Sequence, residues 1–106
     1  MLPEELLARR LEWACAKDLD GAAFEIVLED PAPAAIGVSV LQARLSGPPA
    51  RFVQFSLVFR GPADPLLPQG TYRFRHAALG DFAFFITPVA RTAQAADYEA
   101  CFSHAP

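Results

Sequence analysis

The segment "TYRFRHAALGDFAFFITPV", residues 71–89, has the pattern of two β-strands joined by a tight turn. Its first part alternates aromatic and polar side chains up to His76, as expected of a strand with one buried face. The following "AALG" ends in Gly80, which we expect to supply the positive φ of a short hairpin. In the second part Phe85 points away from the neighbouring aromatic residues, so both faces of this strand need cover.

The same period of two extends to both sides of this hairpin. Strands are predicted at residues 24–29, 36–47, 51–60, 71–76, 81–89 and 97–102. The apolar positions change face between Val40 and Leu41, which predicts a bulge or a strong bend. Because no long helical pattern separates the strands, we expect an antiparallel sheet of about six short strands, curled or partly closed into a barrel.

Residues 3–17 are predicted to form one amphipathic helix. Pro3 suits a first helical position, acidic residues follow it, and Gly21 lies beyond the expected end. The apolar stripe of this helix consists of Leu7, Leu11, Ala14 and Cys15. A helix of this length is marginal in isolation, so it needs a surface on which to pack.

These elements predict an α+β fold in a single domain, residues 1–106. The helix and its turn, residues 1–20, are expected to pack on an antiparallel β body at residues 21–103. The helical stripe is expected to cover Phe85, and a second chain is the alternative cover. With that face covered, we expect a monomer or a weak homodimer.

The composition argues against several classes of function. The net charge is −3, and the nine basic residues form no cluster apart from the alternating Arg73 and Arg75, so a nucleic-acid partner is not expected. The longest uncharged stretch, residues 31–43, is too short to span a membrane and contains two prolines. No secretory signal pattern is present at the N-terminus, and we expect a cytoplasmic protein.

The two cysteines, Cys15 and Cys101, are far apart and form no C-x-x-C pair. Two reduced thiols are expected, and a disulfide between them is the alternative. Neither a nucleophile formed by Cys101 with His104 nor a zinc site has a readable spacing. We therefore expect no catalytic residues, no metal and no cofactor.

The loop at residues 61–70 is stiff by composition, because it contains three prolines. The candidate binding residues in and around it are Arg60, Asp64, Tyr72, Arg73, His76 and Phe85. We expect structural roles for the polar ones: Arg60 pairs with Asp64 or caps a carbonyl, Arg73 lies on a solvated face, and His76 has a backbone partner. The alternative is an anion site or an acid–base pair among these side chains.

A pattern across residues 55–89 carries a resemblance to a known family. It consists of an F-S-L-x-F strand, then G-P, L-P-Q-G-x-Y, H-x-x-L-G and an aromatic strand ending in P-V, with weaker likeness at residues 24–28 and 98–100. The chain resembles a bacterial family of small single-domain proteins catalogued as a domain of unknown function. The resemblance implies no activity, and it favours an assembly or accessory role beside phage-tail-like proteins. The segment "ARRLEWACAK" is longer and more basic than the lead-in expected for that family.

Two functions remain open from the sequence. The first is a non-enzymatic binding or assembly module for an unknown protein partner, acting through an apolar sheet face or the 61–70 loop. The second is a small-ligand binder or enzyme with an aromatic pocket inside the curled sheet, to which Tyr72, Arg73, His76 and Tyr98 would contribute. An internal cavity of about 300 Å³ or more favours the second function. A filled interior with an exposed apolar patch favours the first.

Overall fold

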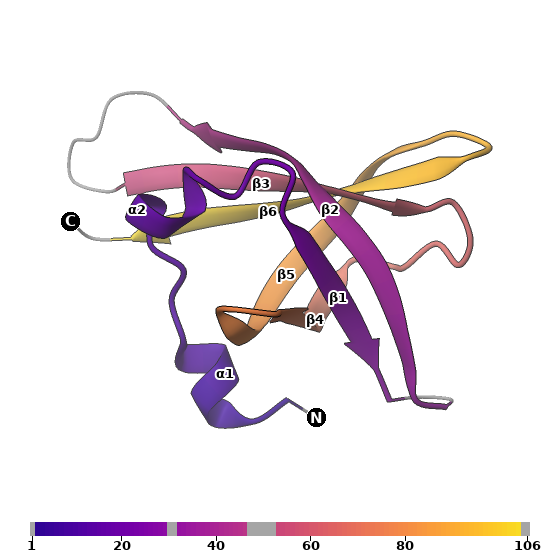
Figure 1. The fold of residues 1–106 in the computed structure, drawn as a ribbon, viewed down its shortest axis with the longest axis horizontal. Coiled ribbons are helices and arrows are strands. Elements are labelled where there is room, and N and C mark those ends of the chain that lie inside the picture. The colour runs from indigo at the N-terminus through magenta and orange to yellow at the C-terminus, as the bar shows by residue number, and fades with distance from the viewer. Residues whose placement is uncertain (1, 30–31, 47–52, 105–106) are drawn as a thin grey trace.

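The computed structural model describes residues 2–29, 32–46 and 53–104. In these ranges the strands are β1 (Ala23–Leu28), β2 (Ala34–Leu45), β3 (Val53–Pro62), β4 (Gly70–His76), β5 (Gly80–Arg91) and β6 (Ala95–His104). They form a closed barrel in the order β1-β2-β3-β6-β5-β4, and all neighbouring strands are antiparallel (Figure 1). The prediction of about six antiparallel strands is therefore confirmed, and the barrel is closed rather than partly closed.

The α+β prediction, with one helix packed on the sheet, is wrong. Residues 3–17 instead contain two short helices, α1 (Glu4–Ala8) and α2 (Trp13–Ala16), so the fold is a mostly-β barrel. Between them the backbone is extended at Arg9 (φ −73°, ψ 126°) and at Glu12 (φ −85°, ψ 151°). The intervening segment inserts Leu11 into the core, where it is 2% exposed. Tertiary packing thus outweighs the local helical pattern, which is only a weak preference.

Inward-facing aromatic side chains fill the barrel. The large buried side chains include Phe24, Phe55, Phe59, Phe74, Phe82, Phe84 and Tyr98. Their rings contact one another, with Phe59 and Phe74 at a centroid distance of 4.8 Å and Phe24 and Phe59 edge to face at 5.6 Å. No polar side chain other than Tyr98 shares this core among the described residues. The interior is therefore an apolar core built from contacting aromatic side chains.

One end of the barrel is closed by residues 9–19, here called the closing segment. In the described chain β5 and β6 pair only from Thr87 opposite Glu99 to Arg91 opposite Ala96, and beyond this they diverge (Figure 1). The closing segment crosses the resulting mouth with three buried apolar residues, Leu11, Ala16 and Leu19. Trp13 packs on Phe55 at a ring distance of 5.4 Å. The closing segment thus completes the core, whereas α1, which precedes it, has no buried residue.

The loop after β3 closes the opposite end. The backbone N–H of Leu67 donates to the hydroxyl of Tyr98 at 3.0 Å, and the hydroxyl of Tyr72 donates to the carbonyl of Pro68 at 2.6 Å. Leu67 is buried, as expected for a loop that covers the core, whereas Leu66 is exposed.

Two predicted local features are confirmed. The pairing of β2 with β3 shifts register between Val40 and Gln42, at the expected bulge. Gly80 has φ +84° in the β4–β5 hairpin. Both features are specified by neighbouring residues, which is why the sequence pattern sufficed.

Candidate functional site

A groove on the outside of the barrel lies between α1 and the wall formed by β1 and β4. Its volume is about 410 Å³. The apolar lining consists of Leu2, Leu7, Val27 and Leu28, and the polar lining of Glu29, Thr71, Tyr72 and Arg73. We call this feature the outer groove. It combines apolar surface with one cationic and one anionic side chain.

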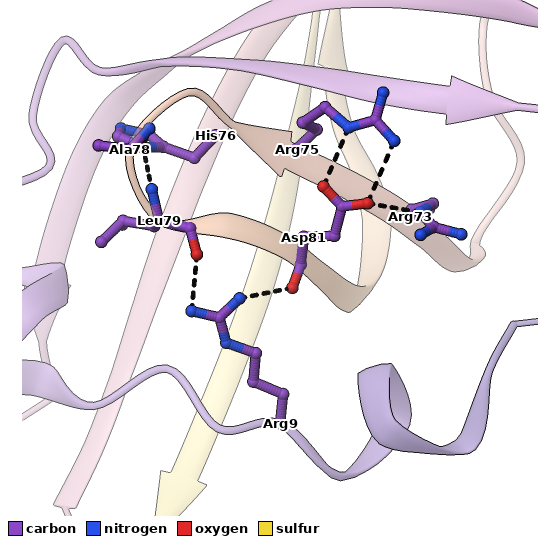
Figure 2. A network of polar contacts seen from close by, with 7 residues as sticks. All are labelled: Arg9, Arg73, Arg75, His76, Ala78, Leu79 and Asp81. Atoms are coloured by element: carbon purple, nitrogen blue, oxygen red, sulfur yellow. Dashed lines mark hydrogen bonds and ion pairs between the residues drawn. The ribbon is translucent and has the colours of Figure 1, made fainter.

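Arg73 enters the outer groove from β4, where it lies opposite Val27 of β1. Its Nε donates to the Asp81 carboxylate at 2.7 Å, and its side chain is 27% exposed. Arg75 donates to both oxygens of the same carboxylate, at 3.0 and 3.2 Å (Figure 2). The hydrogen bonds from Arg75 lower the pKa of Asp81, against burial, which raises it, and the bond from Arg73 adds to the lowering. The ionised carboxylate therefore fixes both guanidinium groups.

The β4–β5 turn beside this network is held by two further side chains. The Nδ1 atom of His76 accepts the backbone N–H groups of Ala78 at 3.1 Å and Leu79 at 3.0 Å. Arg9 donates to the carbonyls of Leu79 and Asp81 at 2.7 and 2.8 Å (Figure 2). The predicted backbone partner of His76 is confirmed. Because Nδ1 already accepts these bonds, the imidazole has a structural role in the β4–β5 turn.

The expected pair of Arg60 with Asp64 is wrong. Arg60 instead makes two hydrogen bonds to Asp97 of β6, at 2.8 and 2.9 Å. These bonds lower the pKa of Asp97, against burial, which raises it. Asp64 lies in the exposed loop, so proximity in sequence was misleading here. Arg60 lies at a smaller pocket of about 210 Å³ with Arg91 and Asp97, not in the outer groove.

Phe85 lies on β5 directly opposite Thr71, which lines the outer groove. Its side chain is 53% exposed, so the prediction that a helical stripe covers it is wrong. Of that stripe, Leu11 is buried at the mouth, while Leu7 lines the outer groove and is 58% exposed. Phe85 thus forms an apolar rim beside the groove.

The family model for Domain of unknown function (DUF6916) matches residues 11–102. The chain belongs to this family. No curated protein and no solved structure matches it. In this DUF6916 member α1 precedes the matched range, so one wall of the outer groove lies within the family match and the other lies outside it.

The structure brings only part of the predicted site of this DUF6916 member together. Tyr72 and Arg73 line the outer groove and Phe85 borders it, whereas His76 serves the turn. The sequence interpretation missed the groove positions of Leu2 and Leu7, and also Glu29 and Thr71. The alternation in the predicted strand 24–29 places Glu29 on the face opposite Phe24 and Ile26. Its proximity to β4, however, depends on the closure of the barrel between two strands distant in sequence.

The thiols of this DUF6916 member give no sign of nucleophilic chemistry. Cys15 and Cys101 are free, so the structure does not contain the disulfide that was the alternative. Burial raises the pKa of the Cys101 thiol, and the nearby Glu99 raises it further, which disfavours the thiolate. Across the described ranges, no group of three or more His, Cys, Asp or Glu residues could hold a metal ion. No helix there is long and apolar enough to cross a membrane.

Proposed function

We propose that this protein is a non-enzymatic binding module that docks a protein partner on the outer groove and its Phe85 rim. The observation that carries the proposal is the exposure of Phe85, the strand partner of the groove residue Thr71, and of Leu7 in the groove lining, at 53% and 58%. Large apolar side chains gathered at one concave surface are typical of interaction sites. Aromatic residues are also enriched among the side chains that contribute most to binding.

The filled interior favours this function over a ligand pocket inside the barrel. The side chains considered for such a pocket have other roles: the Tyr72 hydroxyl donates to Pro68, and the Tyr98 hydroxyl accepts from Leu67. His76 accepts two N–H groups of the turn. These polar groups therefore do not converge on a shared space, and we propose no enzymatic activity.

We propose a setting for this module from its small size, its outer surface and its thiols. An accessory role in an assembly, such as a phage-tail-like structure, suits a small module whose outer surface offers a docking site. Two free thiols suit a reducing compartment such as the cytoplasm. In isolation the protein is proposed to be a monomer or a weak homodimer.

The test is quantitative co-purification from the native host with a matched pair of variants. Phe85→Glu adds a charge at the rim, and Leu41→Glu adds one at a similarly exposed apolar residue of β2, 47% exposed. We expect the wild type and Leu41→Glu to retain the same partner, and Phe85→Glu to lose at least about tenfold of it. Equal recovery with both variants, after circular dichroism shows both to be folded, would refute the role of this surface.

A further inference from the structure

The guanidinium of Arg73 donates a hydrogen bond from Nε, and its other N–H groups are available to a ligand. Among the described residues its hydrogen bond is made by Nε to Asp81, whereas a guanidinium has five N–H donors. Asp81 carries one negative charge and also accepts two bonds from Arg75. Glu25 of β1, the strand partner of Arg75, provides a second negative charge, so what Arg73 offers to a ligand is its unused N–H donors. The remaining donors of Arg73, a residue of the groove lining, suit an additional anion.

The outer groove has opposite charges a short distance apart. Val27 is the Cα partner of Arg73, and Glu29 lies two residues farther along the same face of the chain. The pairing of β1 with β4 ends at Val27 opposite Arg73, so Glu29 lies just beyond the paired part of β1 and lines the same groove as Arg73. In the described chain Glu29 has no ion-pair partner. An extended peptide, which advances roughly 3.3 Å per residue, can meet both charges as it crosses the groove.

Apolar surface lies beside the guanidinium. Leu7 and Val27 line the same groove as Arg73. An internal Asp or Glu side chain would bring a carboxylate without an apolar group on the same residue. The last residue of a peptide can bring both, because its backbone ends in a carboxylate while its side chain is apolar.

We propose that the outer groove binds the free C-terminus of an extended peptide. The terminal carboxylate binds Arg73, the last side chain is apolar and packs on Leu7 and Val27, and a basic side chain two residues upstream faces Glu29. The proposal rests on the function proposed above and identifies the part of the partner that docks. Planar, paired donors of arginine suit a carboxylate better than a lysine would.

The first experiment is a titration of the intact protein, followed by methyl NMR, with the peptide acetyl-Gly-Lys-Ala-Leu. We expect saturable shifts of the Leu7 and Val27 methyl signals and no shift of Leu41, which lies on β2. The C-terminal amide should raise Kd by at least about tenfold, because a charge-assisted pair is lost. Glutamate in place of the peptide lysine should raise Kd by about threefold or more. Equal affinity of acid and amide, or absence of saturable shifts at millimolar peptide, would overturn the proposal.

The second experiment uses variants. Arg73→Gln should abolish the preference for the acid over the amide, Arg73→Lys should retain part of it, and Arg91→Gln, a change at an exposed arginine outside the groove, should leave it unchanged. If Arg73→Gln does not fold, Glu29→Lys at the exposed position that follows β1 provides the test, because it should reverse the preference between lysine and glutamate peptides. Unchanged preferences in these variants would overturn the assignment.

Failure of this inference is distinguishable from failure of the proposed function. A native partner that is lost by Phe85→Glu but bound equally by Arg73→Gln would leave the docking function intact and refute the C-terminal recognition. Acid-selective peptide binding without any native partner would support the C-terminal recognition and would refute the docking of a native protein partner.

Discussion

Replacing Leu11 with alanine should destabilise this protein far more than the same replacement at Leu7. Both residues belong to the apolar stripe that a single helix would have buried together. In the structure Leu11 is 2% exposed at the mouth of the barrel, and Leu7 is 58% exposed. Burial of a leucine side chain contributes about 1.5–3 kcal/mol, and the cavity left by alanine raises the loss to about 2–5 kcal/mol. At Leu7 the free energy of unfolding should change by at most about 0.5 kcal/mol.

Urea denaturation followed by tryptophan fluorescence and circular dichroism measures this difference. The pair differs in position only, so each variant controls for the other. For a domain of this size, Leu11→Ala should lower Tm by about 8 °C or more. Equal effects of the two substitutions, or a loss below about 1 kcal/mol at Leu11, would refute the assignment of the closing segment to the core.

Three further predictions concern the β4–β5 hairpin and the Cys101 thiol. Gly80→Val should lower the free energy of unfolding by more than about 1 kcal/mol in thermal melts, because a β-branched residue is strained at φ +84°; an unchanged Tm would contradict this. The hydrogen bonds from Arg75 and Arg73 hold the pKa of Asp81 below its unfolded value, so their contribution is complete above about pH 4 and is lost as the pH falls through the folded pKa. Urea midpoints measured from pH 7 downward should therefore fall less steeply for Asp81→Asn than for the wild type, and parallel curves would argue against this linkage. Cys101, whose pKa is raised by burial, should be alkylated by iodoacetamide more slowly at pH 7.5 than a model thiol, although it is exposed; the same rate would show that its thiolate is not disfavoured.

The parts of the fold that depend on neighbouring residues could be predicted from the sequence. The strand faces, the register shift after Val40 and the conformation of Gly80 all follow from local patterns. The sequence could not show that the predicted single helix is interrupted. The interruption buries Leu11 among residues far along the chain, and this burial outweighs the local helical pattern. Arg60 was likewise assigned to the nearer acid, whereas the barrel places it beside Asp97.

The candidate site was predicted in part for the same reason. Tyr72, Arg73 and Phe85 could be selected from the alternation within the hairpin. Their neighbours in the outer groove come from β1 and α1, and neither element is adjacent to β4 in sequence. A groove between elements that are distant in sequence leaves no local pattern, because the residues that line it obey separate periodicities.

The closing segment also has a consequence for the order in which the molecule is assembled. Arg9 bonds to carbonyls 70 and 72 residues later in the chain, and Trp13 packs on a residue of β3 that in turn pairs with β6. Contacts of such long sequence separation form slowly, because the intervening chain must be ordered before they are gained. During synthesis the closing segment leaves the ribosome before its docking surface exists. Its Leu11 and Trp13 side chains then remain exposed until β6 emerges, a period in which a chaperone could bind them.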